Sequence, residues 1–379
     1  MGPLTGTRMV EIAGIGPGPF CAMVLADLGA DIIRIDRADR VMPGDPASPP
    51  ADLLNRGRRS IGVDLKNPEG VALVLDLIAD SDALIEGFRP GVMERLGLGP
   101  DVCLERNPRL VYGRMTGWGQ DGPLAPVAGH DINYISLAGA LGAIGRAGQP
   151  PTPPLNLVAD FGGGGMVLAL GICAAMVERN TSGQGQVIDA AMVDGVAIMM
   201  SIFHGMAAMG LWNEERGTNM LDSGAHWYDA YETSDGQFVS IGPVEAQFYD
   251  QLLSLVGLDP VEYPHFDKAR WPELKVRFAE IFRGRTRDEW CELLEGTDVC
   301  FAPVLSMREA AQHPHNVARK TFVEVAGVEQ AAPAPRFSRT PGSIERPPPH
   351  AGQHTDEVLA SLGFDDARVA ALRTSGAVA

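Results

Sequence analysis

Strands and helices alternate in the hydrophobic pattern of the first 120 residues. Short apolar runs predict β-strands at 8–14, 31–36, 60–65, 82–88 and 109–119. Between them, amphipathic runs predict helices at 18–29, 68–81 and 91–98. This alternation predicts an α/β fold with a mostly parallel sheet, in which ligands bind at the carboxyl ends of the strands.

The pattern changes beyond residue 140. A Gly- and Pro-rich stretch at 145–165 leads into an apolar helix at 166–179. From residue 222 onward, a strand hairpin around Ser234-Asp235-Gly236 and the helices that follow it indicate a smaller α+β region. A proline-rich return at 332–364 ends in a short helix.

These changes predict two domains, for which a chain of 379 residues is long enough. We expect a Rossmann-like large domain over 1–200 that is completed by the C-terminal return 325–379. A linker at 201–221 would then lead into a small α+β domain at 222–324.

The first predicted strand runs into the glycine turn "AGIGPGP" at 13–19, which has the outline of a dinucleotide-binding loop. Gly14 and Gly16 fit the first two glycines of that fingerprint, but Pro19 occupies the third position. Proline lacks a backbone N–H, so this turn offers fewer hydrogen-bond donors to a phosphate. Asp36 ends the second strand at a plausible distance for a ribose contact. We interpret the segment as a Rossmann-like βαβ start and do not expect a redox dinucleotide.

Composition narrows the class of protein. The formal net charge of −17 argues against general nucleic-acid binding. No apolar run approaches the length of a membrane helix, and the first residues lack the basic start and apolar core of a signal peptide. We therefore expect a cytoplasmic protein that binds neither nucleic acid nor membranes.

The spacing of cysteines and histidines does not support a metal site. The five cysteines are scattered along the chain and form no CxxC pair. The histidine pairs His313/His315 and His350/His354 lie in proline-bearing stretches without a clear third ligand. We expect reduced thiols and no bound metal ion.

Basic residues are mostly arginine, and several of them gather early in the chain. Only four of the 31 Lys and Arg residues are lysines. The early arginines are Arg34, Arg37, Arg40, the run "NRGRRS" at 55–60, Arg89 and Arg95. A planar guanidinium matches phosphate oxygens in a two-pronged contact. In an acidic chain, this grouping favours a site for a polyphosphorylated small molecule over a set of unrelated surface charges.

Two segments concentrate candidate acid–base groups. His130 lies in "AGHDINY", and Asn156 precedes Asp160 by four residues in "PPLNLVADFGGGG". If these two residues lie one helical turn apart, Asn156 could hydrogen-bond Asp160 and hold its rotamer. A carboxylate followed by the glycines 162–165 and a helix would lie near a helix N-terminus, where unpaired N–H groups could cradle an oxyanion. Structural roles fit the spacing equally well, with Asp160 as an N-cap and His130 as a satisfied core histidine. The chain contains no GxSxG, GxxxxGK[ST] or HExxH motif.

A series of longer motifs extends over nearly the whole chain. They are "AGIGPGP" (13–19), "LADLGADIIRIDR" (25–37), "NRGRRSIGVDLK" (55–66), "IEGFRPGVMERLG" (85–97), "MTGWGQDGP" (115–123), "GHDINY" (129–134), "PPLNLVADFGGG" (153–164), "GQVIDAAMVDG" (185–195) and "PRFSRTPG" (335–342). Together they are far more specific than a single glycine turn. On these motifs the chain resembles the α-methylacyl-CoA racemase family, within the family III CoA-transferase superfamily.

The resemblance implies a ligand for the first βαβ unit and for the early arginines. In the family this unit receives the adenosine and phosphates of coenzyme A, which is part of the substrate, so no separate cofactor is expected. The arginines in segments that surround CoA in the family are Arg37, Arg56, Arg59, Arg89 and Arg95. Arg37 and Arg89 match most closely, whereas Arg58 could exchange roles with Arg56 or Arg59.

The resemblance also implies a mechanism. In the racemases a histidine and an aspartate act as two bases on opposite faces of one carbon, and His130 and Asp160 match them. Glu245 matches the glutamate that supports the histidine, and Asn156 the asparagine that supports the aspartate. These matches imply interconversion of (2R)- and (2S)-2-methylacyl-CoA thioesters through an enolate. Family members are dimers whose chains thread through one another, so we expect an interlocked homodimer in which Glu245 reaches His130 across a subunit boundary.

Two alternatives remain at this point. In the transferase branch, an aspartate at the place of Asp160 attacks the thioester and forms an acyl anhydride before CoA passes to another carboxylic acid. His130 favours the racemase branch, because transfer needs no base on the opposite face. The second alternative is a catalytically idle CoA-binding protein, against which the intact set of four matching residues weighs.

Overall fold

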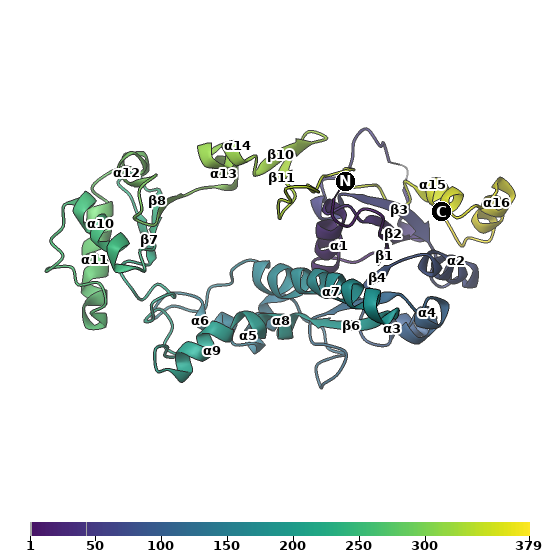
Figure 1. Ribbon diagram of the computed structural model, residues 1–379, viewed down its shortest axis with the longest axis horizontal. Helices are drawn as coiled ribbons and strands as arrows, with labels where there is room; N and C mark the ends of the chain where they lie inside the picture. Colours follow the sequence, from purple (N-terminus) through teal and green to yellow (C-terminus); the bar gives the residue numbers. More distant parts are fainter. Residues whose placement is uncertain (1, 43) are drawn as a thin grey trace. The chain divides into compact units, whose positions relative to one another are not determined.

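The computed structural model describes residues 2–42 and 44–379, which divide by their contacts into two units (Figure 1). The first unit comprises Met1–Ala138, Leu155–Met199 and Lys320–Ala379, and the second comprises Gly139–Pro154 and Met200–Arg319. Residues 139–154, which were expected in the large domain, and 201–221, which were expected to form a linker, both group with the second unit by contacts. The expected linker also contains a helix, α9 (Ser201–Ala208).

A parallel six-stranded sheet forms the centre of the first unit, with the strand order β3-β2-β1-β4-β5-β6. The strands are β1 (Arg8–Ile12), β2 (Asp31–Arg37), β3 (Arg58–Val63), β4 (Ala83–Glu86), β5 (Val111–Thr116) and β6 (Gln186–Ala191). This is the strand order of a Rossmann fold, in which the order reverses between β1 and β4. The predicted α/β class and parallel sheet are confirmed. Strand β6 was not predicted, because it is a largely exposed edge strand with a mixed polar and apolar pattern.

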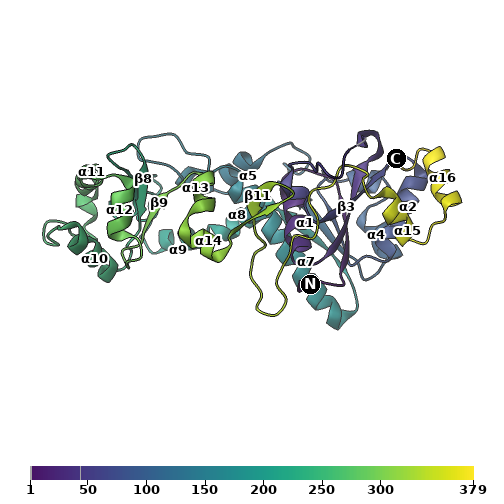
Figure 2. The ribbon, with the colours of Figure 1, turned by 90° about the horizontal axis from the view of Figure 1, so that it is seen from above.

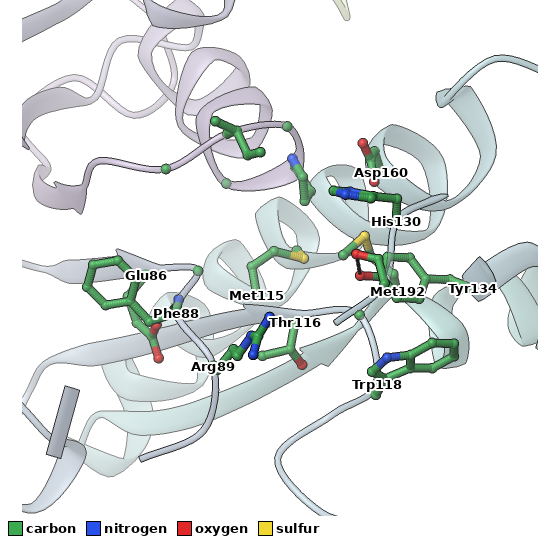
Figure 3. Close-up of a pocket in the computed structure, with 18 of the residues that line it drawn as sticks. Glu86, Phe88, Arg89, Met115, Thr116, Trp118, His130, Tyr134, Asp160 and Met192 are labelled. Atoms are coloured by element: carbon green, nitrogen blue, oxygen red, sulfur yellow. Dashed lines mark hydrogen bonds between the residues drawn. The ribbon is translucent and has the colours of Figure 1, made fainter. Parts of the chain in front are cut away.

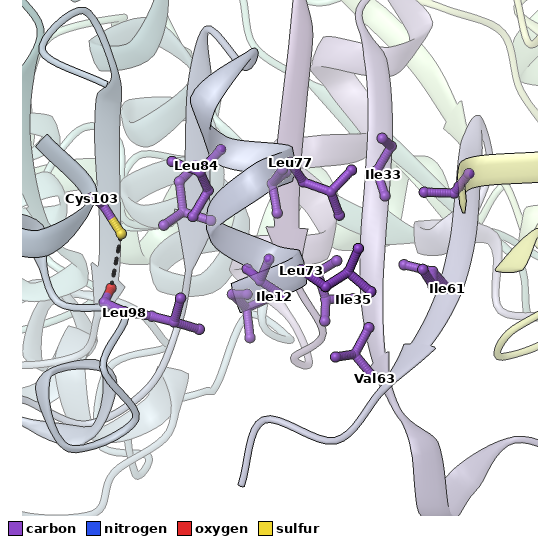
Figure 4. Packing of buried hydrophobic residues seen from close by; sticks show 14 of the residues in the cluster. Ile12, Ile33, Ile35, Ile61, Val63, Leu73, Leu77, Leu84, Leu98 and Cys103 are labelled. Carbon is purple, nitrogen blue, oxygen red and sulfur yellow. Dashed lines mark hydrogen bonds between the residues drawn. The ribbon is translucent and has the colours of Figure 1, made fainter. Parts of the chain in front are cut away.

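Four helices pack over one face of this sheet through a shared buried cluster, part of which Figure 4 shows. They are α2 (Pro68–Ala79), α4 (Pro100–Arg106), α15 (Thr355–Ser361) and α16 (Asp366–Thr374). Leu73 and Leu77 of α2 pack against Ile33 and Ile35 of β2 in one buried cluster, to which the C-terminal helices also contribute. Figures 1 and 2 both show α15 and α16 beside α2. The last helices of the chain therefore pack in the same hydrophobic core as its first strands.

The C-terminal return is fastened to the edge strand β3. The Ser60 N–H donates to His354 Nδ1 at 3.2 Å, and the His354 N–H donates to the Ser60 carbonyl at 2.8 Å. Further on, the Ala379 N–H donates to the Gly62 carbonyl at 3.1 Å. The hairpin β10 (Phe322–Val325) and β11 (Val328–Ala331) precedes the proline-rich part of the return. An otherwise open sheet edge is thereby covered by the chain itself.

The other face of the sheet carries α1 (Pro17–Asp27) and one long helix. The long helix begins with the π-helical segment η3 (Leu157–Met166) and continues as α7 (Val167–Ser182). It packs against α1, β5, β6 and α8 (Met192–Met199). Although no membrane-length apolar run was expected, Leu157–Ser182 spans 26 residues with a mean hydropathy of 1.7, long and apolar enough to cross a membrane by composition alone. One face of it packs on the sheet, and 39% of its most apolar 18-residue window is buried.

The second unit has its own sheet and core. Its antiparallel sheet has the order β7-β8-β9, with strands β7 (Asp229–Glu232), β8 (Phe238–Ile241) and β9 (Phe301–Val304). The predicted hairpin is confirmed, because β7 pairs antiparallel with β8 across the turn at Gly236, whose φ is 72°. Helices α10 (Ala246–Val256), α11 (Trp271–Phe282) and α12 (Arg287–Leu294) bury Trp227, Tyr249 and Phe278 with the sheet.

Short elements complete both units. The first unit also contains η1 (Ala38–Arg40), η2 (Leu53–Asn55), α3 (Val92–Arg95) and α5 (Asp131–Leu137). The second unit also contains α6 (Ala140–Ala143), η4 (Lys268–Arg270), α13 (Met307–Gln312) and α14 (Pro314–Arg319). Of these elements, α5 and α3 matter most here, because they follow the carboxyl ends of β5 and β4.

Candidate active site

A cavity of about 650 Å³ lies at the carboxyl ends of β1, β4 and β5 (Figure 3). The turns that follow these strands form its walls: 14–19 after β1, 87–90 after β4 and 117–118 after β5. His130, Tyr134, Asn156, Asp160 and Met192 complete the lining. The cavity therefore lies at the point where the strand order reverses, which is where α/β sheets of this topology bind ligands.

The glycine turn of the cavity makes room for a carboxylate. Gly16 has a φ of 68°, and a Cβ at this position would lie only 3.2 Å from Asp160 Oδ2. Asp36, the candidate for a ribose contact, instead accepts hydrogen bonds from Ser60 Oγ at 2.7 Å and from Arg34 Nε at 3.2 Å. The turn thus has the outline of a dinucleotide loop. Because Gly16 has no Cβ, the turn can lie close to the side chain of Asp160.

Asp160 is held by the residue one helical turn before it. Asn156 Nδ2 donates to Asp160 Oδ2 at 3.0 Å, which is the contact that the four-residue spacing suggested. Burial raises the pKa of the Asp160 carboxyl, and the negative charge of Asp131 acts in the same direction. The hydrogen bond from Asn156 and the neighbouring His130 oppose this rise, so the pKa remains above its ordinary value but less so than burial alone would make it. A carboxyl with a raised pKa is better matched to taking up and releasing protons near neutral pH.

His130 is exposed and faces the same cavity as Asp160 (Figure 3). It is the N-cap of α5, and its backbone N–H donates to Asn133 Oδ1 at 3.0 Å. The Tyr134 hydroxyl donates to the carbonyl of Gly129, the residue before His130, and its ring packs edge-on against Trp118 with the ring centroids 4.7 Å apart. The alternative of a core histidine is therefore wrong. The aromatic pair fixes the backbone that presents the imidazole.

The glycine tract after Asp160 has a packing role. The predicted oxyanion cradle at 162–165 is wrong, because these glycines lie inside the helix Leu157–Ser182 rather than before its start. A Cβ at Gly164 would lie 2.8 Å from the Ala159 carbonyl oxygen and 2.8 Å from Met192 Cγ, and one at Gly165 would lie 2.8 Å from the Pro17 carbonyl oxygen. Glycine is needed there so that the helix can approach α1 and α8 closely.

Of the arginines predicted to bind CoA, three lie at or beyond the carboxyl ends of the strands. Arg89 is exposed and lines the cavity, in the turn after β4. Glu86 shapes this turn, since it accepts from the Phe88 N–H at 2.7 Å while Arg114 Nε holds its other oxygen at 3.0 Å. Arg95 is exposed at the end of α3. Arg37 is exposed at the end of β2 and pairs with Asp39, whose hydrogen bond raises the pKa of the guanidinium.

The other two predicted arginines lie near the amino end of β3, outside the cavity lining. Every side-chain nitrogen of Arg56 has a protein partner: Nε and Nη2 bind the Asp27 carboxylate, and Nη1 binds Gln330 and the Ala331 carbonyl. Arg59 Nη2 donates to Asp31 Oδ2 at 2.6 Å. Both side chains are buried. Their contact with CoA stays a prediction, and the observed partners give both of them a structural role.

A buried ion cluster, which was not predicted from the sequence, supports the glycine turn that lines the cavity. Arg58 is fully buried and donates through Nε to Glu11 Oε2 at 3.1 Å, while Arg34 Nη1 donates to Glu11 Oε1 at 3.0 Å. Arg58 also donates to the carbonyl of Pro19, in the first turn of α1. This cluster ties the glycine turn to the sheet. In the run "NRGRRS", only burial distinguishes Arg58 from an arginine that binds a ligand.

Glu245, the predicted support for the histidine, lies in the second unit. It is exposed and occupies the N-cap position of α10, where its carbonyl accepts from the N–H groups of Phe248 and Tyr249 at 3.1 Å. Its role toward His130 stays a prediction. Among residues 2–42 and 44–379, no group of three or more His, Cys, Asp or Glu side chains is arranged to hold a metal ion.

Fold and cavity together define a Rossmann-like α/β enzyme that presents a histidine and a carboxylate where related folds bind a redox dinucleotide. Residues 4–355 match the model of CoA-transferase family III. The alpha-methylacyl-CoA racemase of Mus musculus is 46% identical over 375 residues, covering 98% of this chain and 96% of the relative. That of Homo sapiens is 45% identical over 365 residues, covering 95% of this chain and 94% of the relative. The chain therefore belongs to CoA-transferase family III, and its resemblance to the racemases is confirmed.

Comparison with solved structures gives the same result for the fold. A CaiB/BaiF family protein from Brucella suis superposes with a TM-score of 0.80 at 26% sequence identity, covering 95% of this chain and 99% of that one. The predicted combination of a Rossmann-like sheet with a smaller α+β region is thus found in a crystal structure of similar length.

Proposed function

We propose that this enzyme is a racemase that interconverts (2R)- and (2S)-2-methylacyl-CoA thioesters. The observation that supports this most strongly is that His130 and Asp160 line one cavity at the carboxyl ends of the strands (Figure 3). The similarity to two alpha-methylacyl-CoA racemases over nearly the full chain supports the choice of substrate class.

The mechanism requires a proton carrier on each face of C2. One of the two residues removes the C2 proton, and the electron pair of the broken C–H bond moves into the thioester to form an enolate. The other residue then donates a proton to C2 from the opposite face, which inverts the centre without net oxidation or reduction. No cofactor or metal is part of the proposal.

Solvent exchange tests this function directly. The enzyme is incubated with one epimer of a 2-methylacyl-CoA in deuterated water, and label at C2 is followed together with epimer composition. We expect incorporation of deuterium and approach to a near-equal mixture of epimers without added metal or nucleotide. No exchange at any enzyme concentration would falsify the racemase proposal.

The transferase alternative predicts different chemistry at Asp160. Its carboxylate would attack the thioester carbonyl, release CoA as a thiolate and form an acyl anhydride. Hydroxylamine would then cleave the anhydride, either leaving an aspartyl hydroxamate at position 160 and releasing the carboxylic acid, or releasing an acyl hydroxamate and restoring the Asp160 carboxylate. Turnover would depend on an added carboxylic acid. We expect neither result, because exposed His130 supplies a second proton carrier that this reaction does not need.

We further propose an interlocked homodimer in which Glu245 of one subunit supports His130 of the other. Co-refolding a His130→Ala chain with a Glu245→Ala chain tests this arrangement. A mixed dimer then contains one site with both residues intact, so activity should return above that of either variant alone. If both residues of a site came from the same chain, every site would lack one of them and no activity would return.

Two further predictions accompany the proposal. Contact between the arginines and the phosphates of CoA stays a prediction, and Arg37, Arg89 and Arg95 are its best-placed members. A cytoplasmic location likewise stays a prediction.

A further inference from the structure

The helix that carries Asp160 does not cap itself. Asn156 occupies the N-cap position of η3, where an asparagine usually accepts a hydrogen bond from a backbone N–H of the first turn. Within the described chain its side chain makes no such bond and donates to Asp160 Oδ2 instead. The first-turn N–H groups of this helix therefore need an acceptor from elsewhere.

Asp131 supplies that acceptor from a different helix. Its Oδ2 accepts from the N–H of Ala159 at 2.7 Å and from the N–H of Asp160 at 2.8 Å. Asp131 is 5% exposed and is the first residue of α5, directly after His130. One carboxylate oxygen thus joins the backbone of Asp160 to the residue that follows His130.

We propose that Asp131 is a positioning residue that fixes the backbone of Asp160 relative to His130 and leaves Asn156 free to hold the Asp160 carboxylate. This inference rests on the proposed function, because it assigns a role toward the two proton carriers. It differs from ordinary capping, in which the acceptor would come from the N-cap residue itself.

The second oxygen of Asp131 indicates that its charge also matters. Oδ1 is buried and has no hydrogen-bond partner among the described residues. Such an orphaned acceptor is unfavourable, and an amide oxygen could accept the same two N–H groups. The carboxylate acts on Asp160 through space, since its charge adds to the burial that raises the pKa of Asp160. The other groups that act on Asp160 are Asn156 and His130, which oppose the rise.

Among the described residues, no other charged side chain shifts the pKa of Asp160. Tyr134 of α5 has its own pKa raised by burial and by the charges of Asp160 and Asp131. The turn before α1 approaches Asp160 through Gly16, which has no titratable side chain. A change in the acid limb of the pH profile after substitution of Asp131 therefore reports its charge on Asp160.

Three variants separate positioning from general stability. Asp131→Ala removes both the acceptor and the charge, whereas Asp131→Asn keeps an acceptor oxygen and removes the charge. The control is Asp101→Ala, an exposed acid in the first turn of α4 of the same unit. Each variant is assayed for inversion of a 2-methylacyl-CoA and for exchange of its C2 proton in deuterated water. Backbone hydrogen exchange of peptides covering 155–166 is measured by mass spectrometry without substrate.

We expect Asp131→Ala to lower kcat for inversion by about 10–100-fold, because a small misplacement of a base is enough to do so. KM should change by less than about threefold, since no substrate contact is removed. The epimer whose proton His130 removes should still exchange with retention, while the other epimer exchanges slowly. Backbone exchange at 155–166 should become faster. Asp131→Asn should recover most of kcat and move the acid limb of kcat/KM to lower pH, and Asp101→Ala should behave as wild type.

The inference is overturned if Asp131→Ala leaves inversion and the 155–166 peptides unchanged. It is also overturned if exchange of both epimers falls equally, or if Asp131→Asn is no better than Asp131→Ala and its acid limb does not move. If Asp131→Ala fails to fold, Asp131→Asn decides the matter through its pH profile. If the wild-type enzyme itself shows no exchange at C2, the proposed function fails, and that result is distinct because the peptide measurement needs no substrate.

Discussion

The carboxyl and amino ends of the parallel strands use arginine in opposite ways. At the carboxyl ends, Arg89 and Arg95 are exposed around the turn that lines the cavity. At the amino end of β3, Arg56, Arg58 and Arg59 are buried against carboxylates. The same residue type is thus exposed near the cavity at one end and buried in ion pairs at the other.

The difference shows that clustering of charge in a sequence does not establish its use. A buried guanidinium must be paired, and the chain provides Asp27, Glu11 and Asp31 for this purpose. An arginine that binds a phosphate group needs free donor nitrogens and access to solvent. Substitutions at the two ends should therefore change different quantities, catalysis at one and stability at the other.

The largest effect is expected from the two proton carriers at the carboxyl ends. Asp160→Ala and His130→Ala should each lower the rate of inversion by about 10²–10⁴-fold, the usual contribution of a positioned acid–base group. The midpoint of thermal unfolding should change little, because His130 is exposed and Asp160 is half-buried. His315→Ala, an exposed histidine of the second unit, is the control and should retain full activity. Unchanged kinetics in both variants would return these residues to structural roles.

The next largest effect is expected at the amino end of β3. Arg56→Met leaves the buried carboxylate of Asp27 without its partner, and breaking such a pair costs about 3–5 kcal/mol of unfolding free energy. Denaturant titration measures this loss. If Arg56 instead contacts CoA, the stability should hold and KM should rise, which would remove the contrast between the two ends.

Arg89 provides the matched comparison at the carboxyl end. Arg89→Ala should raise KM for the CoA thioester by about 10–100-fold, the equivalent of one charge-assisted hydrogen bond of about 1.5–3 kcal/mol. The unfolding free energy should stay within about 0.5 kcal/mol of wild type, as for other exposed positions. Inhibition by free CoA should weaken in parallel. A variant with lower stability and unchanged KM would place Arg89 with the structural arginines.

The smallest effect is expected at Asn156. Its hydrogen bond lowers the pKa of Asp160 against the effect of burial, so Asn156→Ala should raise that pKa further. Asp160 must be ionised to accept a proton, and the acid limb of kcat/KM should therefore move to higher pH. At the pH optimum the rate should fall by only about 2–10-fold, which corresponds to a net hydrogen-bond contribution of about 0.5–1.5 kcal/mol. A limb that moves to lower pH, or does not move, would separate Asn156 from the ionisation of Asp160.

Much of the fold could be predicted from the sequence, because strands and helices of the first unit carry strong periodic patterns. The four-residue spacing of Asn156 and Asp160 also translated directly into a hydrogen bond. The prediction of an oxyanion cradle at the glycines 162–165 was wrong, because a glycine tract is compatible with an anion-binding loop and equally with close helix packing. Neither the burial of Arg58 nor the contact of Asp131 with a distant helix leaves a local signal, because both depend on residues far apart in the chain.

The measurement that tests the two-base mechanism most directly is solvent exchange in the two single-base variants. His130→Ala and Asp160→Ala are each given the (2R) and the (2S) thioester separately in deuterated water. If the residues act on opposite faces of C2, each variant should exchange the proton of one epimer with retention of configuration, and the favoured epimers should be opposite in the two variants. Exchange of the same epimer in both variants, or of both epimers in either, would contradict a histidine and a carboxyl that flank one carbon.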